Sequence, residues 1–108
     1  MIVIKNKNLL TSVRVSQLSA IAVKDRPCTF FMDSGETFRS SENLKEIEPK
    51  LPPYFMRIDR DCIINIRRIK QIDIKKREVE LINGLTFGFS RRTTKPLVAR
   101  FTRVPEKQ

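Results

Sequence analysis

The stretch FMRIDRDCIINIRRIKQI, residues 55–72, decides how this chain folds. Its apolar residues recur at neither a strict helical nor a strict strand spacing, and arginines and two aspartates stand between them. We therefore expect a strand, a charged turn from which Arg60 projects, and a second strand in succession. The residues expected to anchor these strands in the core are Phe55, Ile58, Ile63, Ile64, Ile69 and Ile72.

Apolar and polar residues alternate with a two-residue period over much of the remaining chain, which predicts short β-strands. Residues 33–36 (DSGE) predict a hairpin, and so does Asn83-Gly84, because both of its residues tolerate the positive φ of a tight turn. We also expect residues 13–15 and 18–23 to form a strand pair joined by Ser16-Gln17. The other expected strands are 1–4, 28–32, 37–39, 69–74, 78–82 and 85–89.

Two segments change to a helical period. Ser40 and Ser41 suit an N-cap, and apolar residues three to four apart follow them, which predicts an amphipathic helix over about residues 41–50 that prolines end. Ser90 is expected to cap a C-terminal helical turn that begins late or is distorted, because Pro96 lies in it. The fold class is mainly β, with about eight to ten short strands, one amphipathic helix and a C-terminal helical turn.

Length and composition limit the classes of protein. The 108 residues fit a single domain over residues 1–108. No apolar run reaches the roughly 18 residues of a membrane span, and the first residues are too polar for a secretory signal, so we expect a cytoplasmic protein with no membrane contact. Cys28 and Cys62 are far apart and histidine is absent, so we expect no metal, no cofactor and no catalysis, and two buried cysteines.

The charge is unevenly distributed. The chain carries a net charge of +10, and residues 55–108 hold 14 Lys and Arg against 6 Asp and Glu, whereas residues 1–54 hold 8 against 6. A basic half on a small domain points to a polyanionic partner such as nucleic acid, because each phosphate contact releases condensed counterions. Solubility alone explains a net charge of about 2 to 8 in a small domain, so the excess is mild.

Three motifs in order carry a family resemblance. Phe55-x-Arg57-Ile58-x-Arg60-x-x-Ile63-Ile64-Asn65 is preceded by the helical stretch NLKEI, residues 43–47. Leu81-x-Asn83-Gly84 and then Phe89-Ser90-Arg91-Arg92 follow it. This ordered combination resembles the LytTR-type DNA-binding domains over about residues 9–102. The resemblance implies an elongated, mostly antiparallel β fold that contacts DNA with loops, in place of a recognition helix.

The resemblance also implies which residues contact DNA. Carried over residue by residue, the base contacts of the second and third loops fall on Arg60 and Arg92, and Arg26 is the candidate in the first loop, residues 24–28. Arginine suits this task because its guanidinium donates two hydrogen bonds to guanine. The candidate phosphate contacts are Lys24, Arg67, Arg68, Lys70, Lys75, Lys76, Arg77, Arg91 and Lys95. Arg57 is expected to be structural, and Asn65 to stabilise a turn.

The implied function is sequence-specific binding of double-stranded DNA by a bacterial transcription regulator that self-associates on repeated half-sites, and we expect no receiver domain in this chain. One alternative is a basic domain that binds RNA or the ribosome, and another is an interaction module for an acidic partner protein. The chain departs from the family at Asp59 and Asp61, where histidine and a small hydroxyl residue are usual. These carboxylates repel phosphate, orient Arg60, or accept a hydrogen bond from cytosine N4.

Overall fold

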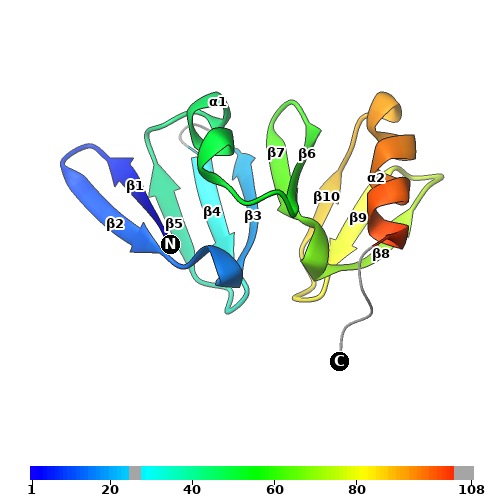
Figure 1. Cartoon of the computed structure of the whole chain (residues 1–108), viewed down its shortest axis with the longest axis horizontal. Helices are drawn as coiled ribbons and strands as arrows, with labels where there is room; N and C mark the ends of the chain where they lie inside the picture. Colours follow the sequence, from blue (N-terminus) through cyan, green and yellow to red (C-terminus); the bar gives the residue numbers. More distant parts are fainter. Residues whose placement is uncertain (25–27, 104–108) are drawn as a thin grey trace.

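A computed structural model describes residues 1–24 and 28–103. The described chain is mainly β and elongated, with extents of 41 × 31 × 23 Å (Figure 1). All strand pairs are antiparallel. The expected mainly β fold class is therefore confirmed.

A central sheet of five strands has the order β5-β4-β3-β7-β6. Its strands are β3 (Leu18–Val23), β4 (Cys28–Met32), β5 (Thr37–Ser40), β6 (Phe55–Asp59) and β7 (Cys62–Asn65). Two smaller sheets flank it: β1 (Ile2–Asn6) pairs with β2 (Leu9–Val13), and β9 (Glu78–Leu81) pairs with both β8 (Ile69–Asp73) and β10 (Thr86–Gly88). The hairpin signals are confirmed, since Gly35 and Gly84 both take positive φ, 94° and 92°.

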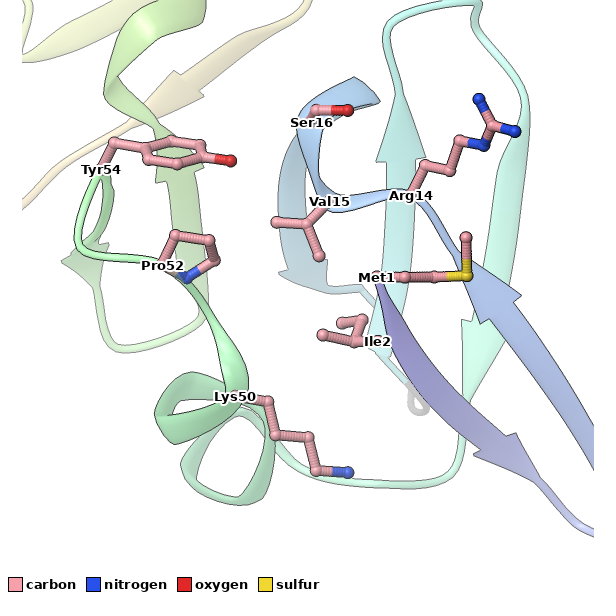
Figure 2. A pocket seen from close by; sticks show the side chains of 8 residues that line it. All are labelled: Met1, Ile2, Arg14, Val15, Ser16, Lys50, Pro52 and Tyr54. Atoms are coloured by element: carbon pink, nitrogen blue, oxygen red, sulfur yellow. The ribbon is translucent and has the colours of Figure 1, made fainter.

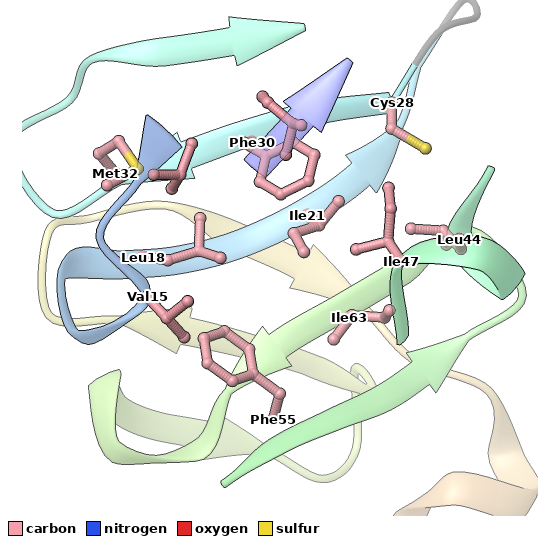
Figure 3. Close-up of a cluster of buried hydrophobic side chains, with 12 residues drawn as sticks. Val15, Leu18, Ile21, Cys28, Phe30, Met32, Leu44, Ile47, Phe55 and Ile63 are labelled. Carbon is pink, nitrogen blue, oxygen red and sulfur yellow. The ribbon is translucent and has the colours of Figure 1, made fainter. Parts of the chain in front are cut away.

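The two faces of the central sheet are both covered, and each has its own core. Alternation along β3 and β7 sends Ile21 and Ile63 to one face and Ala20 and Ile64 to the other. The first face packs against β1, β2 and α1 (Leu44–Ile47) (Figure 3). The second face packs against β8, β9 and α2 (Thr94–Thr102). Burial on both faces explains why residues 18–22 are all buried.

The first helix is shorter than predicted. Only Leu44–Ile47 is α-helical, and Glu48–Lys50 continues as a 3₁₀ turn, η2. The N-cap is Asn43, not Ser40 or Ser41, because Asn43 and Glu46 form a capping box in which each side chain accepts from the other residue's backbone N–H. Ser40 Oγ and Ser41 Oγ instead donate to the carbonyl of Lys5 and join β5 to β1.

Two other predictions need correction. Residues 13–15 and 18–23 do not pair with each other, because Val15–Gln17 forms a 3₁₀ turn (η1), β2 ends at Val13 and pairs with β1, and β3 pairs with β4 and β7. The C-terminal helix has nine residues and is preceded by a 3₁₀ turn, η4 (Arg91–Thr93). Pro96 lies in the first turn of α2, where a backbone N–H has no helical acceptor, so the predicted late start is confirmed.

Candidate nucleic-acid interface

The turn between β6 and β7 presents Arg60 to solvent. The register shifts between Arg57 and Asp59, so the strand is bulged immediately before the turn, while Ile58 is fully buried. The Arg60 side chain is 89% exposed, and its Nε lies 3.9 Å from Asp61 Oδ1. An exposed pair at that distance contributes little, so the guanidinium is available to a ligand.

Backbone hydrogen bonds place the start of α2 beside this turn. The Ser90 N–H donates to the Ile58 carbonyl at 3.2 Å, and the Phe89 N–H donates to the Arg77 carbonyl at 3.0 Å. Arg91 and Arg92 follow directly in η4, and both are exposed. The sequence predicts that Ser90 caps the helix. Its side chain makes no cap hydrogen bond, because its Oγ pairs with Thr93 Oγ1 at 2.6 Å.

Two adjoining hollows join these arginines into one surface. The first, of about 450 Å³, is lined by Arg57, Asp59, Arg60, Ser90, Arg92 and Thr93. The second, of about 390 Å³, is lined by Ile74, Arg77, Arg91, Arg92, Thr94 and Lys95. Arg92 lines both hollows, so the two hollows adjoin at this residue. We call Arg60, Arg77, Arg91, Arg92 and Lys95 the basic edge.

The first of the three predicted contact loops begins next to the same turn. The Val23 N–H at the end of β3 donates to the Asp61 carbonyl at 2.9 Å. Lys24 follows and is exposed, whereas Arg26 lies outside the described residues. In Figure 1 the end of β3, the β6–β7 turn and the start of α2 lie along the upper edge of the molecule.

Three of the other phosphate candidates lie elsewhere. Arg67 and Arg68 are in η3 (Ile66–Arg68), at the opposite end of β7 (Figure 1). The Arg67 guanidinium carbon lies 4.0 Å from the centre of the Tyr54 ring, and Arg68 donates to Asp33 Oδ2 at 2.9 Å and to the Ser16 carbonyl at 2.6 Å. Lys70 is exposed on β8. The structure therefore does not bring these residues to the basic edge.

Arg57 and Asn65 have internal partners, as predicted. Arg57 Nη2 donates to the Arg60 carbonyl at 2.7 Å, and Arg57 Nη1 pairs with Glu48 Oε1 at 3.4 Å. Asn65, which is 1% exposed, donates to the Leu18 carbonyl at 2.9 Å and accepts from the Arg67 N–H at 2.9 Å. Leu18 lies 47 residues before Asn65, and Glu48 lies nine residues before Arg57 and outside the motif, so the motif alone does not indicate them.

Both cysteines are buried and unpaired, as predicted. Burial, followed by the nearby carboxylates of Asp59 and Asp61, raises the pKa of the Cys62 thiol to about 12. Burial also raises the pKa of Cys28. Protonated thiols at neutral pH are poor nucleophiles and metal ligands. Among residues 1–24 and 28–103 there is no group of three or more Cys, Asp or Glu that could hold a metal ion.

A further hollow of about 400 Å³ lies at the other end of β7 (Figure 2). The side chains of Ile2 and Val15 face Pro52 and Tyr54 across it, and Lys50 lies at its margin. The Lys50 ammonium pairs with Glu42 at 3.0 Å. Arg14 and Ser16 also line this hollow, so its walls are mixed in polarity, and it shares no lining residue with the two hollows of the basic edge.

Comparison with known proteins identifies the family. The family model of the LytTr DNA-binding domain matches residues 8–102, most of the chain. The chain belongs to the LytTr DNA-binding domain family. A solved LytTr DNA-binding domain from Bacillus cereus, of a protein described as a methyl-accepting/DNA response regulator, has the same fold with a TM-score of 0.76 and 21% identity. The match covers 92% of this chain and 94% of that one.

No curated protein matches this member of the LytTr family. None of the helices in the part of the chain that the structure describes is long and apolar enough to cross a membrane.

Proposed function

We propose that this LytTr domain binds double-stranded DNA sequence-specifically through the basic edge and thereby regulates transcription. The observation that carries the proposal is the adjacency of Arg60 and Arg92, which come from segments about thirty residues apart in sequence and line one hollow. Two exposed guanidinium groups on neighbouring turns can each donate two hydrogen bonds to guanine O6 and N7 in the major groove.

The other residues of the basic edge suit phosphate contacts, beside the base contacts of Arg60 and Arg92. Arg91 and Lys95 flank Arg92 at the junction of η4 and α2, and Arg77 lines the second hollow with them. Cations beside a base-contacting arginine suit phosphate oxygens, which position a protein on the duplex without reporting the sequence. Lys24, exposed next to the β6–β7 turn, extends the same role to the first loop.

Single-stranded RNA is a weaker candidate ligand. Proteins that bind single strands stack bases on exposed aromatic rings between basic residues. All seven phenylalanines lie in the described part of the chain, and every one is buried or partly buried. Tyr54 is partly buried and is covered by Arg67. A protein module for an acidic partner shares the charge of the basic edge, so only binding experiments separate it from a DNA-binding domain.

Binding to repeated half-sites is part of the proposal. The contact loops lie along one edge of an elongated molecule, so several copies can lie side by side on a duplex with this edge towards it. Such an arrangement needs half-sites that repeat along one face of the duplex, about one helical turn or a multiple of it apart.

The decisive experiment is a fluorescence anisotropy titration at two salt concentrations. The ligands are a duplex selected from a random library, a random duplex, single-stranded DNA and RNA. We expect the selected duplex to bind most tightly, by about a thousandfold or more over random duplex. Equal affinity for RNA would favour the RNA-binding alternative, and no binding at low salt would leave the protein-interaction module.

Arg92→Ala tests the base contact directly. We expect the variant to lose about 5- to 150-fold in affinity for the selected duplex, because one bidentate pair discriminates by about 1–3 kcal/mol. Its affinity for random duplex should change little by comparison. An equal loss on selected and random duplex would show that Arg92 contacts only phosphate.

A further inference from the structure

Both backbone polar groups of Arg60 are held by side chains of β6. Asp59 Oδ1 accepts a hydrogen bond from the Arg60 N–H at 2.8 Å. Arg57 Nη2 donates to the Arg60 carbonyl at 2.7 Å. The peptide groups on either side of the most exposed arginine of the turn are therefore fixed by two charged neighbours. The Arg60 side chain itself remains 89% exposed.

Arg57 is held in turn by Glu48, from a different part of the fold. Arg57 Nη1 lies 3.4 Å from Glu48 Oε1. Glu48 begins η2 directly after α1, and α1 is anchored in the core by Leu44 and Ile47, which are 3% and 1% exposed. The capping box at its N-terminus fixes this short helix further. Glu48 therefore stands on an anchored element and not on a free loop.

We propose that Glu48, Arg57 and Asp59 form a positioning relay that presents Arg60 to DNA. This inference rests on the proposed function, because it explains how one base contact of that function is held. Glu48 fixes the guanidinium of Arg57, Arg57 fixes the carbonyl of Arg60, and Asp59 fixes its N–H. The relay assigns a role to Asp59, which the family resemblance leaves unexplained at a phosphate-facing surface.

The physical reason is preorganisation. A bulged turn without these bonds would sample several backbone conformations, and binding would have to select the one in which the guanidinium meets a base. Each side-chain hydrogen bond removes part of that cost before DNA arrives. Hydrogen bonds that involve a charged group are the stronger ones, and both bonds to the Arg60 backbone are of this kind.

The relay and simple electrostatics predict opposite changes in affinity for the selected duplex when a carboxylate is removed. Removing a carboxylate from a DNA-facing surface reduces repulsion and should tighten binding to any duplex. If Glu48 and Asp59 position Arg60, their loss should instead weaken binding to the selected duplex. Alanine and amide substitutions separate the two effects, since both remove the negative charge and only alanine removes the oxygen that accepts the hydrogen bond.

The experiment compares Asp59→Ala with Asp59→Asn, and Glu48→Ala with Glu48→Gln, on the selected and the random duplex. We expect each alanine variant to lose about threefold to tenfold in affinity for the selected duplex, the value of one hydrogen bond, while random duplex binds equally well or slightly tighter. The amide variants should retain most of the specific affinity. Glu36→Ala, at an exposed carboxylate between β4 and β5, controls for loss of charge.

Alanine and amide variants that behave alike, whether both unchanged or both tighter, would overturn the relay. Arg60→Ala in the same assay separates this failure from failure of the proposed function. If Arg60→Ala leaves the preference for selected duplex intact, Arg60 contacts no base. If Arg60→Ala abolishes the preference but the paired variants do not differ, the relay alone is wrong. In the Arg60→Ala background, Glu48→Ala should cause no further loss of specificity.

Discussion

The two ends of β7 carry arginines of the same stretch, residues 55–72, in opposite situations. At one end Arg60 leaves the β6–β7 turn with its side chain 89% exposed and only a distant ion pair to Asp61. At the other end Arg68 donates to Asp33 and to the Ser16 carbonyl, and Arg67 lies over the Tyr54 ring. The Arg60 end belongs to the basic edge, while the guanidinium groups at the other end bind the protein itself.

The arginines of residues 55–72 thus have two kinds of surroundings. An arginine that contacts a carboxylate, a carbonyl or an aromatic ring of its own fold joins different segments of the chain. Arg68, for example, joins residues 16 and 33 to residue 68. Where the nearest carboxylate, Asp61, lies 3.9 Å away and Asp59 accepts from the backbone, the Arg60 guanidinium stays exposed to solvent. Substitutions at the two ends should therefore change different properties, stability at one end and DNA affinity at the other.

The largest effect is expected from Asn65→Ala at the structural end of β7. The substitution removes two hydrogen bonds and leaves the buried Leu18 carbonyl without its donor, so we expect the free energy of unfolding to fall by about 2–4 kcal/mol. Urea denaturation monitored by circular dichroism measures this change. A loss below about 0.5 kcal/mol would show that water replaces the amide, and would contradict the structural role of this end.

Cys62, which begins β7 at the Arg60 end, should lower the free energy of unfolding at alkaline pH. Its folded-state pKa of about 12 lies above the ordinary value of 9.0, so the folded chain retains the proton longer than the unfolded chain. Stability from this group is complete below about pH 9 and is lost as the pH rises towards 12. We expect a loss of about 1.4 kcal/mol by pH 10.

Urea denaturation at pH 8 and pH 10 measures this loss, with Cys62→Ala as the comparison. The variant lacks the titrating thiol, so its stability should fall less between the two pH values. Equal pH dependence in both proteins would mean that the thiol titrates normally in the folded chain.

A smaller effect is expected from Arg68→Ala. Its partners Asp33 and Ser16 lie in the neighbouring loops, and the pair with Asp33 is about one-third exposed, so we expect a loss of about 1 kcal/mol in the free energy of unfolding. The preference for selected over random duplex should not change. A loss of DNA affinity without a loss of stability would reverse the assignment of the two ends and restore Arg68 as a phosphate contact.

The smallest effect is expected from Lys95→Gln on the basic edge. Loss of one phosphate contact should weaken binding to selected and random duplex alike, and should reduce the slope of log affinity against log salt by about 0.9. A salt titration of both duplexes measures the slope. Lys45→Gln, at an exposed lysine of α1, is the matched control and should leave the slope unchanged.

Local patterns predicted much of the fold and part of the candidate site. Asn83-Gly84 and residues 33–36 form the expected turns because the positive φ of Gly35 and Gly84 is a property of single residues. Asn65 stabilises a turn because its amide bonds the backbone two residues later. The exposure of Arg60 and Arg92 follows from their positions in turns, which the motif spacing indicates.

What the sequence could not indicate depends on contacts between distant segments. The predicted helix over residues 41–50 begins only after Asn43 because Ser40 and Ser41 bond to Lys5 in β1, and residues 18–23 pair with β4 and β7. The sequence by itself determined the strands, the turns and the supply of exposed arginines, since these follow from local periodicity and backbone preference. Only the tertiary structure decided which arginines bind the protein and which gather on one edge, because ion pairs such as Arg68–Asp33 and Arg57–Glu48 exist only after the sheets have packed.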